Sequence, residues 1–143
     1  MMKKIFFITL ICFSAFIKNT NAQATGVPDT LAYLQTIVAN KAQYIGQPFS
    51  VLLNNLQIQI KYFSPFASIH HNKSKETSTF FSFYFPLSVA DHYLSYPRLE
   101  IYWQPYLNAI QSNILFDNNN GGWVPTVVSY YTTGIIADIQ ILE

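Results

Sequence analysis

The chain has 143 residues, of which eight are Lys or Arg and seven are Asp or Glu. Half of the residues are hydrophobic and 17% are aromatic, so a chain of this length can bury the core of one domain. Because no basic stripe is present to neutralise phosphates, the composition argues against nucleic-acid binding.

The first 22 residues have the layout of a secretory signal peptide. Lys3 and Lys4 precede an apolar stretch over residues 5–17, and polar and small residues follow as far as Ala22. The apolar stretch is shorter than a membrane span. We therefore expect cleavage after Ala22, with cleavage after Ala24 as an alternative, and a secreted or periplasmic product. An uncleaved membrane anchor is the other interpretation of this segment.

After cleavage, residues 23–143 are expected to form a single domain without a transmembrane segment. They contain five basic and seven acidic residues, so the formal charge changes from +1 to −2. The single cysteine, Cys12, lies in the signal peptide. The processed chain therefore has no disulfide framework, thiol nucleophile or cysteine-ligated metal, and hydrophobic burial must hold the fold together.

Two helices are predicted near the start of this domain. Apolar residues recur every three or four positions over residues 30–45, which indicates one buried face of a helix. Asp29 or Thr30 can cap its first turn, and Gly46 suits the left-handed position that ends a helix. Pro48 can then open a second, short helix.

Four strands are predicted after the helices. Alternation of apolar and polar residues predicts strands over residues 56–62 and 98–104, the first stopping before residues 64–65. Aromatic and β-branched residues favour a strand over residues 78–85. Residues 135–142 form the last predicted strand, although a helix is not excluded there.

The predicted connections differ in how much the sequence defines them. Residues 68–78 form a polar hairpin loop, residues 87–97 a connection or irregular turn, and residues 117–123 a turn. Residues 105–116 are predicted as a helix, with an ordered loop as the alternative, and residues 123–133 stay undefined. The order of elements predicts a small α+β domain, with two N-terminal helices packed on an antiparallel sheet of about four strands.

The sequence predicts neither a metal site nor a cofactor. His70 and His71 are adjacent, so on a strand they would point to opposite faces, and no motif such as H-E-x-x-H includes them. The oxygen-rich run at residues 117–122 lacks the glutamate that completes a calcium loop. We interpret both segments as ordinary solvated loops.

Catalytic motifs are missing as well. No G-x-S-x-G sequence is present, and the glycines are scattered instead of forming a phosphate loop. We therefore predict that the protein is not an enzyme. The alternative is a small hydrolase, which requires Asp91, His92 and Glu100 to converge in the fold.

Aromatic side chains are the leading candidates for ligand binding. Tyr102 is predicted on the polar face of its strand beside the core-facing Trp103, and Trp123 follows a glycine-rich turn. Their apolar rings and polar tips suit sugar stacking or protein contacts, although they can equally fill a core. The sequence thus predicts an exported, non-catalytic binding or accessory protein of the cell envelope. Its partner is an unknown envelope protein or glycan, and a carbohydrate-binding module is the alternative.

Overall fold

The computed structural model describes residues 29–86 and 96–142 of the chain. These residues form an α+β fold with one four-stranded antiparallel sheet, which confirms the predicted class. Two of the helices, α4 and α5, connect β3 to β4, so the helices are not confined to the N-terminal part as predicted. In chain order the elements are α2 (Thr30–Ala39), the 3-10 helix η1 (Lys41–Gln43), α3 (Phe49–Asn55), β1 (Tyr62–Phe66), β2 (Lys75–Ser82), β3 (Arg98–Asn108), α4 (Ala109–Asn119), α5 (Pro125–Tyr131) and β4 (Ile136–Leu142).

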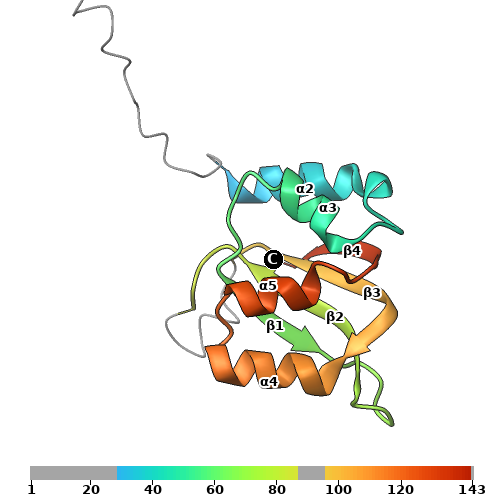
Figure 1. Cartoon of the computed structure of the whole chain (residues 1–143). Helices are drawn as coiled ribbons and strands as arrows, with labels where there is room; N and C mark the ends of the chain where they lie inside the picture. The colour runs from blue at the N-terminus through green and yellow to red at the C-terminus, as the bar shows by residue number, and fades with distance from the viewer. Residues whose placement is uncertain (1–28, 87–95, 143) are drawn as a thin grey trace, which may run out of the picture.

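The strands lie in the order β1-β2-β3-β4, and every neighbouring pair is antiparallel. The ladder between β2 and β3 is irregular between Glu76 and Ser78, and that between β3 and β4 is irregular between Tyr102 and Trp103. Figure 1 shows α5 in front of one face of the sheet, α4 below it beside β1, and α2 and α3 above it near β4.

All of the core-forming helices pack on the same face of the sheet, and aromatic rings dominate the contact. Phe49 of α3 stacks on Phe81 of β2 with ring centroids 4.8 Å apart, and Trp103 of β3 meets Phe49 edge to face at 5.5 Å. Tyr131 of α5 packs against Phe63 of β1 at 5.4 Å. Burial of this apolar face supplies the main stabilisation of a chain that has few charges.

The first predicted helix is shorter than expected. Asp29 caps its start, because its side chain accepts a hydrogen bond of 3.1 Å from the backbone N–H of Ala32. The helix ends at Ala39 instead of residue 45. The side chain of the next residue, Asn40, donates a hydrogen bond of 2.8 Å to the carbonyl of Thr36. An Asn that bonds its own backbone favours a helix end, and the sequence continues as η1.

The predicted strand over residues 56–62 is wrong in position. Ile58 and Ile60 are buried as the alternation predicts, but β1 begins only at Tyr62 and runs through Pro65. Proline is tolerated because β1 is an edge strand, where a missing N–H costs no bond to a further strand.

The remaining strands are predicted with shifted bounds. β2 starts three residues earlier than the predicted strand 78–85, and β3 continues past residue 104 through Pro105 to Asn108. Asn108 then caps α4 by accepting bonds from the backbone N–H groups of residues 110 and 111, so the helix predicted over residues 105–116 begins later. The undefined residues 123–133 contain α5, and the last predicted strand is confirmed as β4.

The start of β4 is joined to the segment between the N-terminal helices. The backbone N–H of Gly46 donates to the carbonyl of Ile136 at 2.8 Å, and the N–H of Ile136 donates to Gln47 at 3.0 Å. The N–H of Phe49 donates to Gly134 at 2.8 Å. Within the two described ranges, no helix has the length and apolar character needed to cross a membrane.

Candidate functional site

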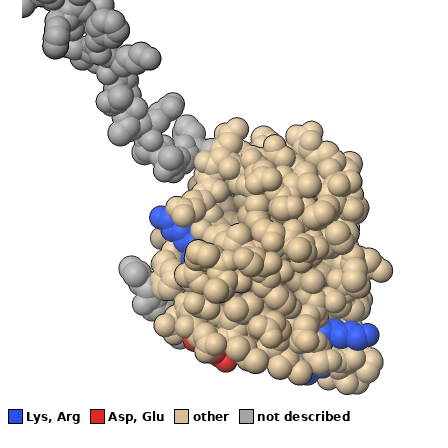
Figure 2. Space-filling model, viewed as in Figure 1, with Lys and Arg blue, Asp and Glu red and all other residues tan. Residues whose placement is uncertain are grey.

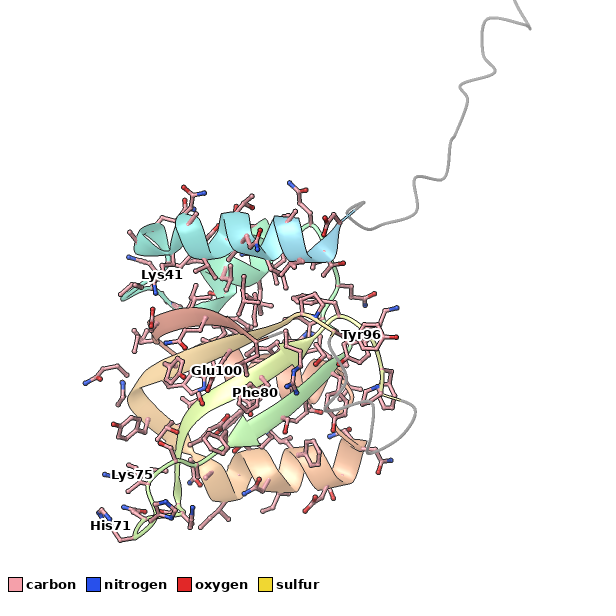
Figure 3. The ribbon with its side chains drawn as sticks, turned by 180° about the vertical axis from the view of Figure 1, so that it is seen from behind. Lys41, His71, Lys75, Phe80, Tyr96 and Glu100 are labelled. Atoms are coloured by element: carbon pink, nitrogen blue, oxygen red, sulfur yellow. The ribbon has the colours of Figure 1, made fainter. Side chains whose placement is uncertain are left out.

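The face of the sheet opposite the core is the main candidate for function, and we call it the open face. Leu99, Ile101 and Trp103 of β3 point into the core, so the alternate residues of that strand lie on the open face. Figure 3 shows this face toward the viewer, with Phe80 and Glu100 on it and no described helix in front.

Glu100 lies near the centre of the open face, yet only 6% of it is exposed. Its Oε1 accepts a hydrogen bond of 2.7 Å from the hydroxyl of Ser78 on β2. The hydroxyl of Tyr102, two residues along β3, also bonds to this carboxylate. Neighbouring side chains bury Glu100 and form hydrogen bonds with it. Its carboxylate therefore holds the hydroxyl of Tyr102 in position and is not exposed to a ligand.

A cleft of about 380 Å³ opens beside Tyr102, between β2, β3 and β4. Two tyrosines and two glutamines contribute to its wall, together with one carboxylate. The lining residues are Ser68, Thr77, Tyr102, Trp103, Gln104, Tyr106, Ala137, Asp138 and Gln140.

Neighbouring groups determine the protonation states of Tyr102 and Asp138 in this cleft. Burial, followed by the hydrogen bond to Glu100 and the charges of Glu100 and Asp138, raises the pKa of Tyr102 to about 12, so the phenol stays neutral. Burial opposes ionisation of Asp138, but hydrogen bonds from Lys41 and Gln140 outweigh it and lower the pKa of Asp138. Lys41 Nζ lies 2.5 Å from Asp138 Oδ1, which forms an ion pair at the wall of the cleft.

A second hollow of about 280 Å³ adjoins this cleft and shares two of its residues. Its lining consists of Lys75, Gln104, Pro105 and Tyr106. The Lys75 ammonium lies 6.0 Å from the centroid of the Tyr106 ring, and Tyr106 is 48% exposed. Gln104 and Tyr106 therefore belong to the lining of both hollows.

The opposite end of the open face is apolar and cationic. The Arg98 guanidinium lies 5.4 Å from the centroid of the Phe80 ring, and the rings of Phe80 and Phe66 are 5.8 Å apart. The guanidinium and the two rings thus contact one another. This end of the open face therefore offers fewer free hydrogen-bonding groups to a ligand than the cleft does.

The three predicted site residues do not form one surface. Tyr102 lines the cleft, as its position on the polar face of the strand predicts. Trp103 is 1% exposed, and its indole N–H donates to Thr79 Oγ1 at 2.8 Å inside the core. Trp123 is half-buried and lines a separate hollow with Leu53 and Leu56. Tyr102 and Trp103 both belong to the lining of the cleft, but Trp103 is almost fully buried whereas Tyr102 is partly exposed.

Sequence reasoning missed most of the polar residues around Tyr102. Tyr102, Gln104 and Tyr106 follow one another at every second position, which is the spacing of one strand face. That pattern becomes visible only when the strand is extended through Pro105. Asp138 and Gln140 join them because β4 pairs with β3 in the register Tyr102 to Asp138.

Of the three residues of the alternative hydrolase site, the structure describes only Glu100. Asp91 and His92 lie outside the described residues, and Glu100 is covered by its hydrogen-bonding neighbours. The exposed His70 and His71 belong to the hairpin between β1 and β2. Over residues 29–86 and 96–142, no three His, Cys, Asp or Glu side chains come together in a way that would hold a metal ion.

Comparison of the chain with protein-family models, with curated proteins and with solved structures finds no match.

Proposed function

We propose that this chain is an exported, non-catalytic binding protein of the cell envelope, and that the cleft on its open face takes a saccharide. The observation that carries the proposal is the lining of the cleft. Tyr102 and Tyr106 supply aromatic rings, while Gln104, Gln140 and Asp138 supply planar hydrogen-bonding groups.

This combination matches the two surfaces of a sugar ring. The C–H groups of a sugar pack on an aromatic face, and its hydroxyls need donors and acceptors at fixed positions. Gln104 and Gln140 offer both donor and acceptor atoms, whereas the paired Asp138 offers acceptors only. Only 10% of the residues of the chain are charged, which fits a neutral, amide-rich recognition protein.

A glycan array probed with the processed chain tests the ligand class, and tryptophan fluorescence measures affinity in solution. Tyr106→Ala removes an exposed ring and should weaken binding at least tenfold, which corresponds to about 1.4 kcal/mol. Tyr96→Ala is the matched control, because Tyr96 is 52% exposed, packs on Tyr84 and lies away from Lys75 in Figure 3. If no saccharide binds, or both variants weaken binding equally, the assignment of the cleft is wrong.

Export is tested separately by sequencing the N-terminus of the protein recovered outside the cytoplasm. Cleavage after Ala22 gives a chain that begins with Gln23, and the alternative cleavage gives one that begins with Thr25. A product that retains Met1 and stays in the cytoplasm would contradict the proposed location without affecting the cleft.

A further inference from the structure

We propose that the ligand is an anionic saccharide of at least two rings, which lies across Tyr106 with one ring in the cleft and its acidic group against Lys75. This inference rests on the proposed function and adds the length and charge of the ligand. It follows from the second hollow, from the cation beside it and from the carboxylates beside Tyr102.

The shape of the site favours more than one ring. A binding pocket for a small molecule usually has a volume of roughly 300–1,000 Å³. The cleft, at about 380 Å³, lies near the lower end of that range, and the neighbouring hollow, at about 280 Å³, falls just below it. Because the two share Gln104 and Tyr106, one ligand can occupy both by crossing the Tyr106 ring.

The charge at the second hollow favours an anion. Lys75 is exposed and lies over Tyr106, and among the described residues the one side-chain ion pair is formed by Lys41 and Asp138. Glu76, the acidic residue next to Lys75 in the chain, is fully buried on the core side. The ammonium of Lys75 is therefore left without a described carboxylate partner.

The surroundings of Lys75 add to this positive character. The hairpin between β1 and β2 also carries Lys73, two residues before Lys75. Figure 2 shows basic side chains at the lower right, where Figure 1 places this hairpin. A carboxylate or sulfate on the second ring would therefore lie near the charges of two lysines.

The negative charges of Glu100 and Asp138 act at Tyr102, so the acidic group of the ligand belongs at the Lys75 end of the site and not in the cleft. Asp138 is held by Lys41 at 2.5 Å, and Glu100 is buried under Ser78 and Tyr102. With both carboxylates bonded inside the protein, the unpaired charge near Tyr106 is the ammonium of Lys75.

The test compares three oligosaccharides of equal length: a uronate oligomer, a sulfated oligomer and a neutral one. Each is titrated against the processed protein and against Lys75→Gln. The acidic oligomers should bind at least tenfold more tightly than the neutral one at low salt, and this preference should shrink as salt rises. Lys75→Gln should remove the preference, so that the acidic oligomers bind no more tightly to this variant than the neutral one does.

Lys73→Gln provides the matched control. It removes the same charge from the same hairpin, but Lys73 Nζ donates to the carbonyl of Ala67 at 3.2 Å and does not line the second hollow. It should therefore lower the preference for acidic oligomers less than twofold.

Three results separate this inference from the proposed function. Equal binding of acidic and neutral oligomers, both lost in Tyr106→Ala, overturns the inference and leaves the saccharide site intact. An unchanged preference in Lys75→Gln also overturns the inference, since the anion then binds elsewhere. Absence of binding by all three oligomers and across the array overturns both proposals. A preference for the sulfated over the uronate oligomer supports the inference and selects sulfate as the acidic group.

Discussion

The hydroxyl of Tyr131 donates a hydrogen bond of 2.9 Å to Oε1 of Glu76, a carboxyl group with no exposed surface. Thr79 donates to the same oxygen, and the indole of Trp103 donates to Thr79 Oγ1 at 2.8 Å. Among the described residues, none forms a hydrogen bond with Oε2 of Glu76. This cluster joins β2, β3 and α5 through polar groups inside an otherwise aromatic core.

Stability should fall as pH rises through neutrality because of Glu76. Burial raises the pKa of this carboxyl from 4.5 to about 7, although Thr79, Ser112 and Tyr131 partly offset the effect by hydrogen bonding. The folded chain therefore holds a proton that the unfolded chain releases. The resulting stabilisation is complete below about pH 4.5, is lost as pH rises through about 7, and amounts to about 3 kcal/mol.

Urea unfolding at several pH values measures this loss. Glu76→Gln keeps the acceptor oxygen and cannot ionise, so its unfolding free energy should change little between pH 5 and 8. The tyrosines around Glu76 do not titrate in this window, because burial and the carboxyl itself raise the pKa of Tyr130 to about 12 and that of Tyr131 further. A wild-type curve as flat as that of the variant would show that Glu76 titrates elsewhere.

Thr79→Val should destabilise the fold by about 2–4 kcal/mol. The change preserves the shape of the side chain but removes the hydroxyl that donates to Glu76 and accepts from Trp103. Both partners then stay buried without that bond, and each such loss costs roughly 1–3 kcal/mol. Thr36→Val is the control, since Thr36 is exposed and bonds only a helix carbonyl, and it should change stability by less than about 0.5 kcal/mol. Equal effects of the two changes would argue against a core role for Thr79.

Gly121→Ala should cost more than Gly46→Ala, although both glycines have positive φ. Gly121 has φ of 71° and Gly46 has φ of 79°, so each alanine carries a strain of about 1 kcal/mol. At Gly121 the new Cβ would also collide with the ring of Tyr62, whereas at Gly46 no atom of the described residues lies within 4 Å. Thermal midpoints should therefore drop more in the first variant. Equal midpoints would mean that the Tyr62 ring moves aside freely.

Lys41→Gln should lower stability by less than about 1 kcal/mol. The ion pair with Asp138 is about one third exposed on both sides, so solvent weakens it. The difference from the wild type should shrink further in 1 M salt, as chemical unfolding with urea and added NaCl can measure. A loss that persists at high salt would point to packing of the lysine stem instead of its charge.

Periodicity predicted the core side of the fold well. Leu99, Ile101 and Trp103 alternate with polar residues and lie in the core, and Asp29 caps the first helix as predicted. The pattern failed at Ile58 and Ile60, which are buried outside any strand. Alternation in the sequence reports which side chains are buried. It does not reveal whether a neighbouring strand is present to form backbone hydrogen bonds with the segment.

The candidate site was less predictable because it depends on pairing between distant strands. Tyr102 could be placed on the polar face from the residues beside it. Asp138 reaches the same cleft only through the register of β4, which is set after two intervening helices. Local spacing carries no information about that register, so the amide and carboxylate groups of the cleft were not recognised.

The bond between Gly46 and Ile136 joins residues ninety positions apart. Closing a loop of that length costs about 4 kcal/mol of chain entropy, which the contacts formed on closure must offset. A chain that is still emerging from a ribosome cannot make this closure until Ile136 has followed. Native structure in this part of the molecule therefore forms only after the start of β4 has been released.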